Sequence, residues 1–176
     1  GEFGTVIQLG ATTMTTYGSL DAVVAKFNGE GEMLWCTHFG GPGLDRGIAL
    51  ALGAAGELVV VGQYMGTASF GTASLTASGA TQDCFTASLN AASGAVNWVR
   101  STGGPDWVDQ PTGVSVGADG TIAIAGEFRG TAQIGSQSFT SSVDPLTGEP
   151  SVDIYIQTYA ADGTDGWSKQ GAAEYA

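Results

Sequence analysis

The sequence repeats itself with a period of roughly 62 residues, and this self-similarity restricts the possible folds more than any other feature. The segment Gly62–Gly71 aligns with Gly126–Gly135 at an offset of 64 residues, and Gly1–Gly10 fits the same template without a gap. One such unit cannot bury its own apolar faces, so the copies are expected to stack on one another. Within a single domain, 1–176, the approximate repeats are 1–61, 62–125 and 126–176.

The repeat also carries two single-residue columns, one acidic and one aromatic. An aspartate opens each of three aligned apolar segments, at Asp21, Asp83 and Asp153. A tryptophan follows each of them after a glycine-containing turn, and the spacing from aspartate to tryptophan is 14, 15 and 14 residues. We expect the aspartates to bond backbone amides where strands begin. Packing area between neighbouring repeats is expected from the tryptophans, Trp35, Trp98 and Trp167.

The local composition of each repeat is that of short strands joined by tight turns. Leu58–Val61 and Ile122–Ala125 are apolar or small on both faces, as in strands that are covered on two sides. The turns are rich in glycine, of which the chain has 29 copies. We therefore predict an all-β protein in which each full repeat forms four antiparallel strands, as in a blade of a β-propeller. The chain would hold about two and a half such blades.

The matched residues resemble a family of bacterial β-propeller repeats, which are rich in Asp and Gly and occur in secreted and surface proteins. The family pattern is fullest in Asp21–Phe27 and Met33–Gly41, and it continues through Asp45 and Val59–Gly62. The second repeat matches more loosely, and the third has an insertion around Val143–Pro150. The resemblance covers nearly the whole chain.

This resemblance implies an extracellular bacterial module that acts as a surface scaffold or in adhesion and presents loops to a glycan or a protein. It implies no catalytic residues. Two alternatives remain: a propeller-type carbohydrate-active enzyme, a hydrolase or lyase, that uses acidic loop residues, and a purely structural spacer. Because closed propellers usually have four to eight blades, we expect the chain to be part of a longer protein. Ring completion by several chains and an open array are the alternatives.

The charge balance argues against two classes of partner. The net charge is −12 and only five residues are Lys or Arg, whereas binding to nucleic acid or to anionic lipid needs a basic surface. No apolar run is long enough for insertion into a membrane as a spanning helix. The expected partners are therefore a glycan or protein ligand, and further blades supplied by a longer chain or by self-association.

The best single candidate for ligand binding is Trp107, which stands outside the tryptophan column in a loop that begins at Gly103-Gly104. Asp106 and Asp109 flank it, and an aromatic ring beside carboxylates is suited to carbohydrate contact. Asp45 occupies the position of Asp109 in the preceding repeat. Asp45 and Asp109 are candidates for contact with a surface cation or sugar, with turn stabilisation as the alternative.

The other chemistry-bearing residues favour structural roles. His38 is the only histidine and lies in an expected strand, so neither a catalytic base nor a zinc site is predicted. Cys36 and Cys84 lack metal-binding spacing and form either a disulfide between neighbouring blades or two buried free thiols. Asp162–Gly166 is explained better by a hairpin turn than by a calcium loop. No catalytic residue, metal site or cofactor is predicted, with weak Ca²⁺ binding as the one alternative.

Overall fold

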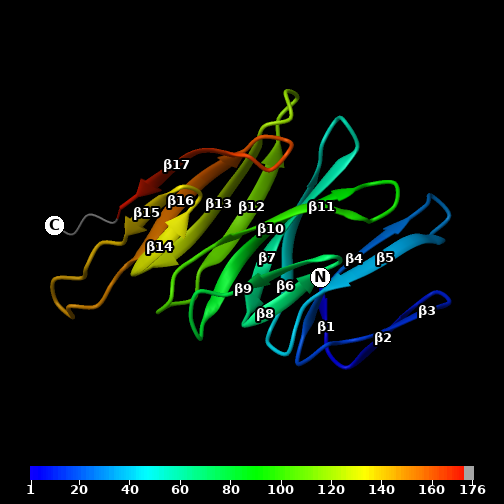
Figure 1. Ribbon diagram of the computed structural model, residues 1–176, viewed down its shortest axis with the longest axis horizontal. Helices are drawn as coiled ribbons and strands as arrows, with labels where there is room; N and C mark the ends of the chain where they lie inside the picture. The colour runs from blue at the N-terminus through cyan, green and yellow to red at the C-terminus, as the bar shows by residue number, and fades with distance from the viewer. Residues whose placement is uncertain (173–176) are drawn as a thin grey trace.

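The computed structural model describes residues 1–172, which consist of β-strands, turns and loops (Figure 1). This range contains no helix, and therefore none that is long and apolar enough to cross a membrane. The prediction of an all-β fold is confirmed. In chain order the strands are β1 (Glu2–Phe3), β2 (Val6–Leu9), β3 (Thr12–Thr15), β4 (Asp21–Phe27), β5 (Met33–Phe39), β6 (Arg46–Leu52), β7 (Glu57–Met65), β8 (Thr67–Phe70), β9 (Ala73–Thr76), β10 (Gln82–Asn90), β11 (Val96–Thr102), β12 (Gln110–Val116), β13 (Ile122–Arg129), β14 (Thr131–Ile134), β15 (Gln137–Thr140), β16 (Val152–Tyr159) and β17 (Asp165–Gly171).

Antiparallel pairing joins most of these strands into three sheets that follow one another across the molecule (Figure 1). The N-terminal sheet has three strands in the order β1-β4-β5. The central sheet, β6-β7-β10-β11, and the C-terminal sheet, β12-β13-β16-β17, have four strands each. In both four-stranded sheets the spatial order of the strands follows their order along the chain. The described residues form an open row of sheets rather than a closed ring (Figure 1).

Each sheet is accompanied by a two-stranded hairpin that the sequence analysis did not separate from it. The hairpins are β2–β3, β8–β9 and β14–β15, and in the central sheet β8–β9 lies in the chain between β7 and β10. The repeated Gly-Thr-Ala motif begins this hairpin: Gly66 and Gly130 both have φ of 69°, which favours glycine. The repeat boundaries 61/62 and 125/126 fall inside β7 and β13. Each four-stranded sheet therefore combines parts of two sequence repeats.

Two apolar cores lie between the three sheets. The first, between the N-terminal and central sheets, includes the stacked rings of Phe39 and Phe70, whose centroids are 5.3 Å apart. The second lies between the central and C-terminal sheets. Side chains alternate along a strand, so that Val60 of β7 belongs to the first core while Val59 and Val61 belong to the second. The central sheet is thus covered on both faces, as the apolar run in β7 predicted.

Tryptophans connect the N-terminal and central sheets, each to a turn of the sheet that follows it. Trp35 Nε1 donates a hydrogen bond to the carbonyl oxygen of Ala91 (3.2 Å), and Trp98 Nε1 donates to that of Ala161 (2.9 Å). Both indoles pack against the core on their side of the sheet. The role between repeats predicted for this column is confirmed for these two residues, whereas Trp167 is 55% exposed.

A glycine lies under each of the two packed indoles. A Cβ at Gly94 would be 2.6 Å from the ring of Trp35, and one at Gly163 would be 2.7 Å from the ring of Trp98. Both glycines also have positive φ, 75° and 80° respectively. Glycine is therefore required at these two positions for two reasons: the backbone conformation, and the close approach of the tryptophan ring of the preceding sheet.

Candidate ligand-binding pocket

The loop from Gly103 to Asp109 leads from β11 into β12, and it is fixed at both ends. Gly103 exchanges two backbone hydrogen bonds with Gln133 of β14 (3.1 and 2.8 Å). The Asp109 carboxylate accepts a hydrogen bond from the Gly104 amide (2.7 Å). A Cβ at Gly104 would lie 2.0 Å from a carbonyl oxygen of β14, so a larger residue does not fit there. This anchored loop presents Trp107.

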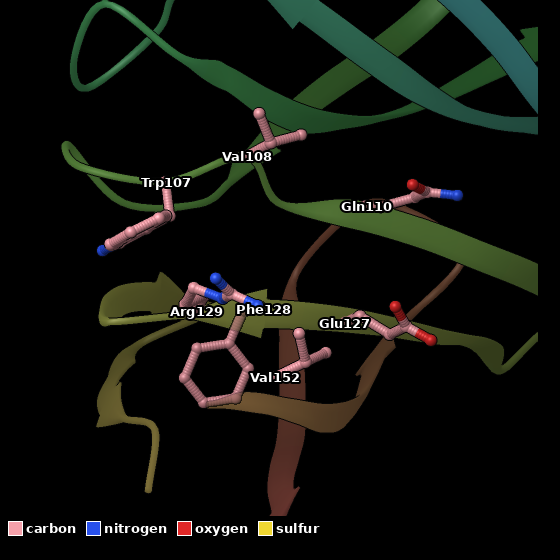
Figure 2. A pocket seen from close by; sticks show the side chains of 7 residues that line it. All are labelled: Trp107, Val108, Gln110, Glu127, Phe128, Arg129 and Val152. Carbon is pink, nitrogen blue, oxygen red and sulfur yellow. The ribbon is translucent and has the colours of Figure 1, made fainter. Parts of the chain in front are cut away.

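Trp107 forms one wall of a pocket of about 290 Å³ at the end of the C-terminal sheet (Figure 2). The guanidinium carbon of Arg129 lies 5.0 Å from the centroid of the Trp107 ring, a cation–π arrangement. The indole also packs on Gly130, where a Cβ would come within 2.8 Å of it. These contacts fix the position of the Trp107 ring in the pocket wall. The pocket is lined by Trp107, Val108, Gln110, Glu127, Phe128, Arg129 and Val152.

Further polar groups of the pocket lie away from the indole. Gln110 and Glu127 are register partners on β12 and β13, and both side chains are exposed. Figure 2 shows them at one end of the pocket, with Trp107 and Arg129 at the other. The pocket therefore combines an aromatic wall with a guanidinium, an amide and a carboxylate. Such a set offers stacking together with hydrogen-bond donors and acceptors to one small ligand.

A second hollow of about 420 Å³ shares Arg129 and Val152 with this pocket. Much of its remaining wall comes from the insertion Val143–Pro150, including Asp144 and Glu149. The insertion folds as a small hairpin, closed by a bridge between its end residues and by a hydrogen bond from the Asp144 amide to the Glu149 carbonyl (2.9 Å). The pocket is thus extended by a segment that the other two repeats lack.

The corresponding place in the preceding repeat is built differently. Met65 takes the position of Arg129, and the loop from Gly40 to Asp45 is shorter than its counterpart and has no tryptophan. A Cβ at Gly43 would lie 2.5 Å from the carbonyl oxygen of Met65, which leaves no room for an indole. The pairing of an aromatic ring with a guanidinium therefore does not recur at this place in the preceding repeat.

Of the residues proposed from the sequence, Trp107 is the one found in the pocket wall. Asp106 is exposed beside it but is not among the lining residues. Asp45 and Asp109 do not lie at a surface edge: each is 1% exposed. Asp45 accepts hydrogen bonds from two backbone amides (2.8 and 3.1 Å), and Asp109 accepts one from Gly104 (2.7 Å). In this structure both carboxylates stabilise turns, which is the alternative that the sequence left open.

Burial changes the acidity of these two carboxyl groups. It raises the pKa of Asp109 to about 7; backbone amides lower the pKa and the nearby charge of Asp83 raises it further. Burial likewise raises the pKa of Asp45 to about 6, against hydrogen bonds from backbone amides and with a smaller contribution from Asp21. A pKa of about 7 means that the Asp109 carboxyl group is partly protonated near neutral pH.

The aspartate column has the structural role that the sequence predicted. Asp21, Asp83 and Asp153 are buried, with exposed fractions of 0, 2 and 1%. Each accepts a hydrogen bond from a backbone amide in the segment that precedes its strand. The amide donors are those of Tyr17, Ser78 and Ser142, at 3.0, 2.9 and 3.1 Å.

The histidine and the cysteines are likewise built into the framework. His38 Nε2 lies 3.6 Å from Asp21 Oδ2, and the rings of His38 and Tyr17 are in contact, with centroids 4.6 Å apart. Cys36 and Cys84 are both free thiols, so the disulfide alternative is not realised. Burial raises the pKa of Cys84 well above its usual value. Within residues 1–172, no group of three or more His, Cys, Asp or Glu side chains is placed to hold a metal ion.

Sequence reasoning missed the partners of Trp107 in the pocket. Arg129, Gln110 and Glu127 lie on strands, and their distance from the loop depends on the register of β12 against β13. One usable signal was the scarcity of cations: the chain has five Lys and Arg residues. Arg129, next to the repeated Gly-Thr-Ala motif, replaces an uncharged Met65 in the previous repeat.

No protein-family model matches the chain, and no curated protein matches it either. The class of molecule is therefore defined by its architecture and its pocket. It is an all-β repeat protein with a tryptophan–arginine pocket beneath the loop that enters its C-terminal sheet.

Proposed function

We propose that this chain is a β-propeller-type repeat module of an extracellular bacterial protein, and that it binds a glycan in the Trp107 pocket as a non-catalytic surface scaffold or adhesion domain. Two features support the propeller assignment: two antiparallel sheets of identical strand order, and apolar cores that neighbouring sheets share. The bacterial surface location rests on the resemblance of Asp21–Phe27 and Met33–Gly41 to the repeats of such proteins.

The single observation that carries the binding proposal is the fixed indole of Trp107 among convergent polar side chains. A sugar ring has an apolar C–H face that packs on an aromatic ring, and hydroxyl groups that need donors and acceptors around it. Arg129 and Gln110 supply donors, and Glu127 supplies an acceptor. A pocket of about 290 Å³ is of a size for one ring and its substituents.

Binding is favoured over cleavage by the acidic groups of the pocket. Glu127 is the single carboxylate among its lining residues. Glycoside hydrolysis generally employs two carboxyl groups on either side of the scissile bond. Asp109, whose raised pKa would suit an acid catalyst, is buried and engaged with the loop backbone.

A glycan array probed with the wild type and with Trp107→Ala tests this proposal. We expect the wild type to bind a defined set of glycans. The variant should bind them with an affinity lower by about tenfold or more, because the stacking wall is lost. Trp167→Ala is the matched control: this residue is 55% exposed on another strand, and its removal should leave binding unchanged. Arg129→Met, the residue of the preceding repeat, should also weaken binding.

Thermal unfolding of each variant separates lost binding from lost folding. Equal binding by the wild type and Trp107→Ala contradicts the proposal, as does the absence of any binding by a folded wild-type protein. Equal losses in Trp107→Ala and Trp167→Ala would show that the site lies elsewhere.

A further inference from the structure

The insertion Val143–Pro150 contains the single Asp–Pro bond of the chain, between Asp144 and Pro145. The insertion joins β15 to β16 (Figure 1). Pro145 is exposed and the next residue, Leu146, is 94% exposed, so water reaches this peptide bond. The other two repeats have no such segment. The chemistry of the bond therefore belongs to this hairpin and not to the repeated framework.

Hydrogen bonds hold both the side chain and the backbone carbonyl of Asp144. The Leu146 amide donates to the side-chain oxygen Oδ1 (2.8 Å), and the Gly148 amide donates to the backbone carbonyl oxygen (2.8 Å). The bond from Gly148 bears on reactivity. An amide that donates to a carbonyl oxygen stabilises the negative charge that develops there when a nucleophile attacks the carbonyl carbon.

We propose that Asp144–Pro145 is a self-cleavage site, at which the Asp144 carboxylate cuts the peptide bond that follows it. Oδ2 attacks the backbone carbonyl carbon of the same residue and closes a five-membered cyclic anhydride. The C–N bond breaks, and the nitrogen of Pro145 takes a proton from the acidic solvent. Water then opens the anhydride, so that Asp144 becomes a C-terminal residue with two carboxyl groups. The net reaction consumes one water molecule.

Proline makes this bond easier to break than the bonds after other acidic residues. Its nitrogen carries two carbon substituents besides the carbonyl and no hydrogen, which favours protonation as the C–N bond breaks. Asp162 offers a comparison: its Oδ1 also accepts a hydrogen bond from the amide two residues on (2.9 Å), but Gly163 follows it. Glu149 precedes a proline, but its longer side chain would have to close a six-membered ring. We expect these two bonds to stay intact.

The cut chain stays assembled, because the strand after the cut remains paired and packed. β16 pairs with β13 over its whole length, from Val152 to Tyr159. Tyr155 and Tyr159 are each 1% exposed in the second core. The change is therefore confined to the insertion hairpin, which walls the hollow beside Arg129. Cleavage opens this wall and leaves Trp107 and Arg129 in contact.

Incubation of the intact protein at about pH 5 tests the proposal, with mass spectrometry to follow the fragments 1–144 and 145–176. At this pH an aspartate in water is still largely ionised, while the solvent supplies the proton for the leaving nitrogen. We expect the folded protein to be cut about tenfold faster or more than a synthetic peptide of sequence Ser142–Val152, because the free peptide does not hold the Gly148 amide on the Asp144 carbonyl. This ratio separates the effect of the fold from the ordinary lability of an Asp–Pro bond.

Asp144→Asn is the matched variant. It keeps an oxygen for the Leu146 amide but lacks the attacking carboxylate, so we expect cleavage to slow by about tenfold or more. Asp162→Asn should be cut as fast as the wild type. Thermal unfolding confirms that each variant is folded. Equal rates for the folded protein and the peptide, or for the wild type and Asp144→Asn, would overturn the proposal, as would a wild type that stays intact.

Gel filtration of the cut protein tests whether the hollow opens within an assembled molecule. We expect one species that elutes with the uncut chain and separates into two pieces only in denaturant. Pieces that separate without denaturant would overturn this part of the proposal. None of these measurements uses a glycan, so their outcome is independent of the proposed function.

Discussion

At the scale of single residues, the two aspartates of the loops entering β6 and β12 contribute to the pH dependence of stability. Asp45 and Asp109 are 1% exposed, and burial raises their pKa values to about 6 and about 7. In the unfolded chain an aspartate titrates near pH 3.8. Between about pH 4 and pH 7 these two groups therefore hold more protons in the folded state than in the unfolded state, and their contribution to the free energy of unfolding falls as the pH rises through this range.

Replacing the acid by its neutral isostere should remove part of this pH dependence. Asp109→Asn can still accept the hydrogen bond from Gly104 but carries no charge at any pH. We expect the variant to be more stable than the wild type at pH 8, by on the order of 1–2 kcal/mol, and to lose this advantage at pH 5, where the wild-type carboxyl is protonated. Urea unfolding at several pH values measures the difference.

The same experiment has a clear contrary result. Parallel curves of unfolding free energy against pH for the wild type and Asp109→Asn would mean that this carboxyl is ionised alike in folded and unfolded chains. Asp45→Asn should show a change centred at lower pH, because the pKa of Asp45 is about 6. It also loses one of two amide hydrogen bonds, those from Gly41 and Met65, because the Asn side chain has a single acceptor oxygen.

Asp106 and Asp109 show where residue-level prediction from the sequence stops. Both acids flank Trp107 in the same loop, yet Asp106 is exposed and Asp109 is buried. Composition does not distinguish them. The carboxylate of buried Asp109 accepts a hydrogen bond from the Gly104 amide, in a loop whose first residue, Gly103, is bonded to Gln133 of β14, a contact between distant parts of the sequence. The tryptophan was identifiable because it departs from a repeated column, a signal that needs no coordinates.

At the scale of elements, the contact between one sheet's tryptophan and the next sheet's glycine turn joins neighbouring units. Trp35 covers Gly94 and donates to the carbonyl of Ala91 in the same turn. Trp98 has the same relation to Gly163 and Ala161. The indole thus combines packing with a directed hydrogen bond. Together these contacts fix both the position of the following hairpin and its distance from the sheet that carries the tryptophan.

A methyl group placed under the indole should disrupt this joint. Gly94→Ala adds a Cβ 2.6 Å from the Trp35 ring at a residue with φ of 75°, and we expect a loss of about 3 kcal/mol in the free energy of unfolding. Gly56→Ala is the matched control: its φ is 87°, but a Cβ there meets nothing within 4 Å. Its loss should be only about 1 kcal/mol, the cost of the backbone conformation. Equal losses measured by chemical unfolding would show that the indole contact contributes nothing.

Elements were predictable from the sequence where the repeat itself encodes them. The apolar runs in β7 and β13 and the tryptophan column gave the strands and the packing between sheets, because both follow from periodic burial. The hairpins β8–β9 and β14–β15 were not separated from the sheets. Their Gly-Thr-Ala motif repeats as faithfully as the rest, and periodicity alone does not tell a strand within a sheet from one that folds away from it.

At the scale of the whole molecule, the two ends of the row of sheets are unlike its interior. Cys84 and Thr86 of β10 are 2% and 4% exposed, because the C-terminal sheet covers them. Tyr155 of that sheet donates its hydroxyl hydrogen to the Cys84 sulfur (3.6 Å). Their counterparts on β16, Ile154 and Ile156, are 55% and 41% exposed. The outer face of the C-terminal sheet is thus apolar, as a covered face would be, but no sheet among the described residues covers it.

An exposed apolar sheet face of this kind should make the chain associate with itself in solution. We expect the mass measured by sedimentation to rise with concentration for the wild type and to stay near that of one chain for Ile154→Thr with Ile156→Thr, since threonine keeps the β-branched shape but adds a hydroxyl. The melting temperature should change by no more than about 2 °C, because both side chains are partly exposed already. Leu146→Thr, at a site 94% exposed on the insertion hairpin, should leave association unchanged. A wild type that stays monomeric at every concentration would show that this face is stable in water without a neighbour, and equal association of all three proteins would place the contact on another surface.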